Sequence, residues 1–308
     1  MAAQPDLAGL ETDATQNRSH AARSQAIADY WALTKPEVNF LILVTTFAGF
    51  YLGSPLGAFR TATLFHTLLG TLLVAGGTGT LNQYIERRFD AQMRRTARRP
   101  LACGRMRPKN ALWFGICLSV FGVAYLAVAT TFLASLLAFL TLTAYLFFYT
   151  PLKRKSALCT IVGAFPGAVP PLIGWAAASG TLSAGAWVLY ATLFLWQFPH
   201  FMAIAWMYRE DYSRAGYLVL PTGKTRDTFL FWQAFILSLG LIPITLIPVS
   251  IGRPHHLAYS LAALLLSSAF SCLAARLSIR KSNVTARQLL LGSVAYLPAI
   301  FALMMFSK

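Results

Sequence analysis

Charged side chains are scarce in this sequence. Only 12% of its 308 residues are Asp, Glu, Lys or Arg, and 56% are hydrophobic. An ordinary soluble domain is about a quarter charged, so the shortfall is large. Several uncharged stretches reach the roughly 18 to 20 residues that a helix needs to cross a bilayer. Because unpaired backbone groups in lipid leave helix as the only open form, we predict an all-α polytopic membrane protein.

Acidic residues and closely spaced cysteines are also few. The chain has 10 acidic and 26 basic residues, which gives a net charge of +16. In a soluble protein this excess would suggest nucleic acid. Here the basic residues gather in short gaps between apolar stretches, where they set orientation, so we expect contact with membrane lipid and no nucleic acid. The four cysteines are too widely spaced for a metal motif, and nothing indicates a disulfide scaffold.

The N-terminal segment lacks the apolar core of a signal peptide. We predict a disordered cytoplasmic tail over residues 1–29 and one membrane domain over residues 30–308. Clusters of Lys and Arg alternate with nearly uncharged gaps, which predicts a cytoplasmic N-terminus and a C-terminus outside. About nine transmembrane helices are expected, at residues 38–54, 63–83, 110–129, 131–149, 160–178, 184–206, 228–250, 256–275 and 288–306.

A first group of polar side chains ends the second of these stretches. Asn82, Glu86 and Asp90 recur at four-residue steps, and each step drifts only about 40° around a helix, so the three share one face. Amide and carboxylate oxygens suit Mg²⁺, which also takes phosphate oxygens from substrates. The alternative is a helix end with ordinary salt bridges to nearby arginines, namely Arg87, Arg88 or Arg94.

A second acidic pair follows the sixth stretch, again on the side predicted to be cytoplasmic. Glu210 and Asp211 are able to meet the first group across a helix bundle, and the two groups together would hold Mg²⁺ on a diphosphate. Arginine and lysine pair well with phosphate oxygens. The basic residues near these acids either bind that diphosphate or only set topology; they are Arg94, Arg95, Lys153 and Arg154.

Two further positions carry candidate chemistry. Tyr149 and Lys153 lie four residues apart at a predicted helix exit, where Lys153 is able to contact phosphate and the Tyr149 hydroxyl to assist. His200 lies inside an apolar stretch, and an ionisable group within a membrane is a functional candidate by default. The His200 ring either contacts a metal-bearing ring, acts as a base, bonds a carbonyl, or serves as a packing residue.

Four separated motifs resemble a known family. They are "NQYIERRFD" with "RRTARRPL", "YTPLKRK", "WQFPHFMAIA" with "YREDYSRAGYLVLP", and the opening "LTKPEVNFLILVTTFAGFYLG". These resemble the UbiA-type intramembrane prenyltransferases, and within them the branch that farnesylates protoheme IX, over about residues 30 to 306. The sequence departs from that branch at Glu86, where Asp is usual, and at Ser156 and Cys159, where Thr and Asn are common.

The resemblance implies a helical bundle around a central cavity open to the cytoplasmic side, in the inner membrane. It implies transfer of farnesyl from farnesyl diphosphate to a vinyl group of protoheme IX, which yields heme O and diphosphate. A heme A synthase or a terminal-oxidase assembly factor is a further expected partner. The alternatives are a prenyltransferase for an aromatic quinone precursor and a transporter of a phosphorylated lipid.

The resemblance also assigns roles to residues. The expected ligands of Mg²⁺ are Asn82, Glu86, Asp90, Glu210 and Asp211. The expected diphosphate-binding residues are Arg94, Arg95, Lys153 and Arg154. The expected catalytic residues are Asp90, Asp211, Lys153 and Tyr149. The expected heme contacts are His200 and Trp196. Aromatic faces that would stabilise an allylic cation are Tyr145, Phe148, Trp175 and Trp196.

Overall fold

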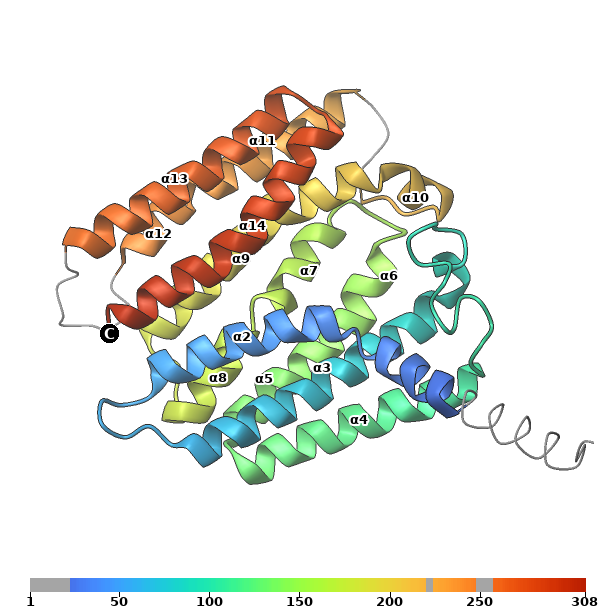
Figure 1. The fold of residues 1–308 in the computed structure, drawn as a ribbon, viewed down its shortest axis with the longest axis horizontal. Helices are drawn as coiled ribbons and strands as arrows, with labels where there is room; N and C mark the ends of the chain where they lie inside the picture. Colours follow the sequence, from blue (N-terminus) through green and yellow to red (C-terminus); the bar gives the residue numbers. More distant parts are fainter. Residues whose placement is uncertain (1–22, 220–223, 248–256) are drawn as a thin grey trace, which may run out of the picture.

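The structure, a computed structural model, describes residues 23–219, 224–247 and 257–308, and within these ranges every regular element is a helix (Figure 1). Nine helical segments in these ranges are long and apolar enough to cross a membrane, as predicted. The elements are α2 (Pro36–Gly53), α3 (Thr61–Asp90), α4 (Pro108–Ala129), α5 (Phe132–Thr143), η1 (Ala144–Tyr149), α6 (Thr150–Leu152), α7 (Cys159–Gly167), α8 (Pro170–Ser179), α9 (Ala184–Met207), α10 (Arg209–Arg214), α11 (Lys224–Leu239), α12 (Leu241–Leu246), α13 (Leu257–Ile279) and α14 (Asn283–Phe306).

Three of the predicted spans are interrupted, and in the seventh Gly240 separates α11 from α12. The fourth continues from α5 through a π-helical turn, η1, into α6. The fifth is divided into α7 and α8, and Pro170 opens the second part. Proline has no backbone N–H and suits the first turn of a helix, so a new helix begins there.

The N-terminal part of the chain differs from the expected tail. Residues 1–22 lie outside the described residues. Residues 23–33 form a helix, so the last part of the predicted tail, 23–29, is helical and not disordered. The Arg105 guanidinium donates to both carboxylate oxygens of Asp29, at 3.0–3.3 Å, and ties this helix to the segment after α3.

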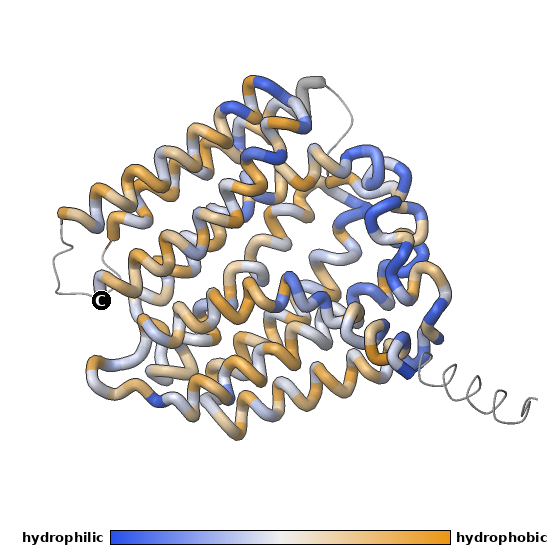
Figure 2. The backbone as a smooth tube through the Cα atoms, viewed as in Figure 1, coloured by the Kyte–Doolittle hydropathy of each residue, from blue (hydrophilic) through white to orange (hydrophobic). Residues whose placement is uncertain are grey.

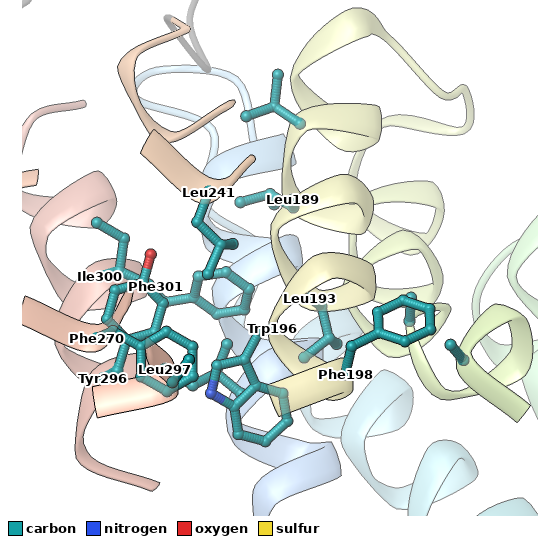
Figure 3. Close-up of a cluster of buried hydrophobic side chains, with 14 of the residues drawn as sticks. Leu189, Leu193, Trp196, Phe198, Leu241, Phe270, Tyr296, Leu297, Ile300 and Phe301 are labelled. Carbon is teal, nitrogen blue, oxygen red and sulfur yellow. The ribbon is translucent and has the colours of Figure 1, made fainter. Parts of the chain in front are cut away.

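The core lies between α9, α13 and α14 (Figure 3). In that view the side chains of Leu193 and Trp196 face Phe270, Tyr296 and the rest of the cluster. Because lipid is as apolar as these side chains, such helices associate through close packing and not through burial from water. On the other side of the bundle α2 packs against α8, and α3 packs against α4.

Polar residues concentrate at one end of the bundle. Figure 2 shows the hydrophilic α10 and the hydrophilic segments that follow α3 and α6 gathered at that end, while the long helices are mostly hydrophobic. The candidate residues of both acidic groups lie at the end of α3 and in α10, and Lys153 follows α6. The fold therefore brings the sequence motifs to one polar end.

Candidate functional site

The C-terminal turns of α3 supply the first acidic group. The helix continues past the apolar span to Asp90, so Asn82, Glu86 and Asp90 lie on one continuous helix. All three side chains are buried, with at most 5% of their surface exposed. Buried polar groups need partners, and the partners of these three define the site.

Lysines contact the first two members of this group. The Lys153 ammonium donates to Glu86 Oε1 at 2.8 Å, and Lys35 Nζ donates to Asn82 Oδ1 at 2.6 Å. Asn82 Nδ2 in turn donates to Glu86 Oε2 at 3.0 Å and to Thr150 Oγ1 at 3.2 Å. The amide and the carboxylate are therefore joined in one network with basic groups at both ends.

The π-helical turn η1 positions the other half of this network. Thr150 Oγ1 donates to the Tyr145 carbonyl at 2.8 Å, which orients the hydroxyl that accepts from Asn82. The Lys153 Nζ lies 4.6 Å from the centre of the Tyr149 ring. Burial alone would lower the pKa of Lys153, but the Glu86 carboxylate outweighs burial and raises that pKa well above its usual value. Glu86 therefore favours the charged form of Lys153, and the catalytic role of Lys153 and Tyr149 stays a prediction.

Asp90 has a different partner from the ones that the sequence suggested. Arg99 Nη1 lies 2.8 Å from Asp90 Oδ2. The Asp90 carbonyl also accepts from Thr96 Oγ1 at 2.9 Å, which folds the following segment back towards the helix end. Arg99 was part of the quoted motif but carried no predicted role.

Asp211 joins the second acidic group to the first. Its carboxylate accepts hydrogen bonds from the backbone amides of Arg94 and Arg95, at 3.3 and 3.2 Å, and pairs with Arg214. Burial would raise the pKa of Asp211, but these amides and Arg214 lower it further, so the group is ionised. The two polar segments, more than a hundred residues apart in sequence, therefore meet.

An apolar cluster holds the same two segments together. Met93, from the segment after α3, is buried against Ala215 and Tyr217, with Phe89 packed beside them. The Leu218 amide donates to the Lys153 carbonyl at 2.8 Å. The loops after α3, α6 and α10 are thus fastened to one another around the acidic residues.

Other predicted residues are placed less centrally. Glu210 is exposed, unlike its neighbour Asp211. The exposed arginines stack on aromatic rings: the Arg95 guanidinium lies 4.8 Å from the Tyr208 ring, and that of Arg154 lies 4.2 Å from the Phe89 ring. The predicted part of Arg94, Arg95 and Arg154 in diphosphate binding stays a prediction.

The proposed heme contacts face α14. Trp196 Nε1 donates to the Ser293 carbonyl at 2.8 Å, and His200 Nδ1 lies 2.7 Å from Ser293 Oγ. The two rings stack with centroids 4.5 Å apart. Trp196 is a core residue (Figure 3), as is Trp175, whereas Phe148 is 61% exposed. A heme contact by His200 stays a prediction.

Sequence reasoning missed Lys35. Lys35 counted only among the basic residues that set membrane orientation. It directly precedes Pro36 at the start of α2, however, and lies in one of the motifs that resemble the family. Burial, with the nearby Arg99 charge, lowers the pKa of Lys35 to about 7. A lysine between a polar segment and an apolar span was the available signal.

The donor set fits a hard divalent cation. Among the described residues no three His, Cys, Asp or Glu side chains gather as a ready metal site. Mg²⁺, however, keeps several waters and is usually held by one or two carboxylates together with substrate phosphates. Oxygen donors of that kind are supplied by one helix, α3, through Asn82, Glu86 and Asp90. Asp211 adds a further carboxylate, which is bonded to the segment after α3.

A crevice of about 550 Å³ lies next to the site, between α7, α9 and α11. Its lining is mostly apolar and includes Phe198, Met202 and Leu218. The polar lining residues are Lys155, Ser156, Thr160 and Gln233. Pockets of this size and character commonly accept small molecules.

Comparison with known proteins identifies the family of this chain. The family model "UbiA prenyltransferase family" matches residues 42–304. A protoheme IX farnesyltransferase from Solibacter usitatus is 44% identical over 288 residues, which are 91% of this chain and 98% of that protein. The protein of the same name from Koribacter versatilis is 42% identical over 291 residues, which are 92% of this chain and 94% of that protein.

Solved structures share the fold at low identity. A digeranylgeranylglyceryl phosphate synthase superposes with a TM-score of 0.66 at 16% identity, over 92% of this chain and 98% of that one. A UbiA homolog from Archaeoglobus fulgidus bound to GPP and Mg²⁺ gives 0.63 at 16% identity, over 90% of this chain and 99% of that one. The chain belongs to the UbiA prenyltransferase family.

Proposed function

We propose that this chain transfers a farnesyl group from farnesyl diphosphate to a vinyl group of protoheme IX, giving heme O and diphosphate. The observation that carries the proposal is the similarity to two protoheme IX farnesyltransferases, which spans more than 90% of this chain. The contact between Asp211 and the segment after α3 supports the diphosphate half of the reaction.

The site must stabilise the charge that develops on the departing diphosphate. We assign Mg²⁺ to Asn82, Glu86, Asp90 and Asp211; Glu210, which is exposed, is the weakest member of the predicted set. When bound, Mg²⁺ neutralises phosphate charge as a Lewis acid. Lys153 is held as a cation beside Glu86 and supplies a fixed positive charge at the same place. Preorganised charges of this kind contribute most in a site that excludes water.

The reaction requires no protein nucleophile. The bond between C1 of the farnesyl group and its phosphate oxygen breaks, and diphosphate leaves with the electron pair. The vinyl π electrons of the porphyrin form the new carbon–carbon bond. Water adds to the resulting porphyrin-side cation, and the proton that it releases goes to diphosphate or solvent. Tyr149 and Tyr145, whose ring centroids lie 4.9 Å apart, are the aromatic faces beside Lys153.

The orientation in the membrane is part of the proposal. Basic residues are enriched in loops on the cytoplasmic side, and nine of the 26 basic residues of this chain lie in the two segments after α3 and α6, at 91–107 and 153–158. We place the polar end in the cytoplasm and the protein in the inner membrane. The bundle has nine candidate spans in its described part, so the two termini face opposite sides.

The test is the identity of the acceptor. Purified protein in nanodiscs is incubated with farnesyl diphosphate, Mg²⁺ and either protoheme IX or 4-hydroxybenzoate, and the extracted products are weighed by mass spectrometry. We expect heme with one added hydroxyfarnesyl unit and no prenylated benzoate, with loss of product in EDTA. Prenylation of the benzoate alone would assign the chain to quinone synthesis. Translocation of a phosphorylated lipid without any product would assign it to transport.

A further inference from the structure

Two lysines from separate elements contact the paired ligands Asn82 and Glu86. Lys35, at the start of α2, donates to Asn82 Oδ1 at 2.6 Å, and Lys153, after α6, donates to Glu86 Oε1 at 2.8 Å. The second Glu86 oxygen accepts from Asn82 Nδ2 at 3.0 Å. Each of these side-chain oxygens therefore already has an N–H donor.

Lys35 reaches this position through a costly backbone conformation. Its φ is +54°, and it is the one non-glycine residue with a left-handed backbone in the described part of the chain. The residue before a proline is additionally biased towards extended backbone. Strained residues persist only where their surroundings hold them, and they cluster at functional sites.

The surroundings of Lys35 are built to hold it. Gln83 Nε2 donates to the carbonyls of Ala32 and Leu33, both at 3.1 Å, and Asn39 Nδ2 donates to the Thr34 carbonyl at 2.8 Å. Gly79 on α3 leaves room for this turn, since a Cβ there would lie 3.3 Å from the Thr34 oxygen. Residues of α2 and α3 thus fix the turn that aims Lys35 at Asn82.

We propose that Lys35 and Lys153 are exchangeable partners of the metal ligands, so that a divalent cation binds this site tightly only together with a diphosphate. The inference rests on the proposed function. A cation that approaches Asn82 and Glu86 must displace both amino groups, and the Lys153 ammonium repels a cation at this range in a medium of low polarity. A diphosphate offers oxygens onto which both lysines can move, because lysine binds phosphate as a point charge.

The consequence is a reciprocal coupling between metal and diphosphate. If bound diphosphate raises the affinity for the metal by a given factor, bound metal raises the affinity for diphosphate by the same factor. In this scheme Lys35 and Lys153 bind the diphosphate, and they act on the metal by releasing its ligands. Removing either lysine should therefore raise metal affinity in the absence of diphosphate and reduce the coupling.

The experiment measures Mn²⁺, as a probe for Mg²⁺, by electron paramagnetic resonance on purified protein in nanodiscs. Titrations are made with and without farnesyl thiodiphosphate, an unreactive analogue. For the wild-type chain we expect the analogue to tighten Mn²⁺ binding by about tenfold or more, within the range usual for coupled sites. For Lys35→Met and Lys153→Met we expect tighter Mn²⁺ binding without the analogue and a smaller effect of adding it.

Lys155→Met is the matched control, because Lys155 is an exposed lysine of the same turn that lines the neighbouring crevice and should leave both titrations unchanged. If Lys153→Met does not fold, Lys35→Met decides the matter alone. Equal Mn²⁺ affinity of the wild type with and without analogue, or unchanged affinity in Lys35→Met, overturns the inference. Coupling in a protein that fails to prenylate heme would contradict only the proposed acceptor. Heme prenylation without coupling would contradict only this inference.

Discussion

Asp211 is the residue through which the two polar segments become one site. It is buried, ionised and held by two backbone amides of the segment after α3, whereas Glu210 beside it is exposed. An amide donor cannot be removed by a side-chain substitution in that segment. We therefore expect Asp211 to keep its position when the side chain of Arg94 or Arg95 is replaced by alanine. The role of each arginine side chain can then be tested without breaking the contact between Asp211 and the segment after α3.

Replacing Arg95 tests its part in diphosphate binding. Its guanidinium is exposed above Tyr208, so Arg95→Ala should leave the fold intact. We expect the apparent KM for farnesyl diphosphate to rise about tenfold, because a hydrogen bond to a charged group contributes roughly 1.5–3 kcal/mol, with kcat little changed. Arg98→Ala, also an exposed arginine of this segment, is the control and should leave KM unaltered. Identical KM values for the two variants would remove Arg95 from the role.

Three of the predicted site residues depend on helical period. Asn82, Glu86 and Asp90 were found because a four-residue step keeps side chains on one face. Lys35 and Arg99 carried no predicted role because their positions depend on tertiary contacts. Lys35 meets Asn82 across 47 residues through a left-handed turn, and Arg99 meets Asp90 after the chain folds back. The spacing of residues in the sequence predicts neither of these two contacts.

At the scale of elements, the turn η1 sets the direction of the basic side of the site. A π-helical turn shifts the register of the side chains that follow it, and such turns are frequent at functional sites. Tyr149, Thr150 and Lys153 all follow or end this turn. The sequence indicated one uninterrupted helix there, because one extra residue in a helix leaves an apolar pattern almost unchanged.

Packing of α7 against η1 gives an element-scale prediction. A Cβ at Gly163 would lie 2.5 Å from Cδ2 of Tyr149, so Gly163→Ala must move that ring and Lys153 with it. We expect kcat to fall by up to about a hundredfold, as a displacement of about 1 Å can cause. Gly76→Ala is the control, since its Cβ would meet its nearest neighbour at an ordinary 3.4 Å. Full turnover in Gly163→Ala would show that the Tyr149 ring position is unimportant.

At the scale of the whole molecule, composition and long uncharged stretches were sufficient to predict the class. Nine spans were predicted, and nine helical segments of sufficient length occur in the described residues. Their ends were less well predicted, because α3 continues as a polar helix through Asp90 and α14 begins at Asn283, before its apolar part. Polar residues at a membrane surface can extend a helix without changing its hydropathy pattern.

An odd number of spans predicts termini on opposite sides. A C-terminal alkaline phosphatase fusion should be active and a C-terminal green fluorescent protein fusion dark, whereas an N-terminal green fluorescent protein should fluoresce. The physical reason is the retention of basic loops on the cytoplasmic side. Fluorescence from both termini would contradict the proposed topology and would move the polar end of the bundle out of the cytoplasm.

The central claim is that both polar segments act on one diphosphate, and single-turnover prenyl transfer in excess Mg²⁺ tests it most directly. The measurement compares wild type, Asp90→Asn, Asp211→Asn and the matched neighbour Glu210→Gln in nanodiscs. We predict that both Asp variants lose about a hundredfold or more in rate, as expected when a charge-stabilising group is removed, while Glu210→Gln stays within about twofold. Wild-type rates in either Asp variant would contradict the account.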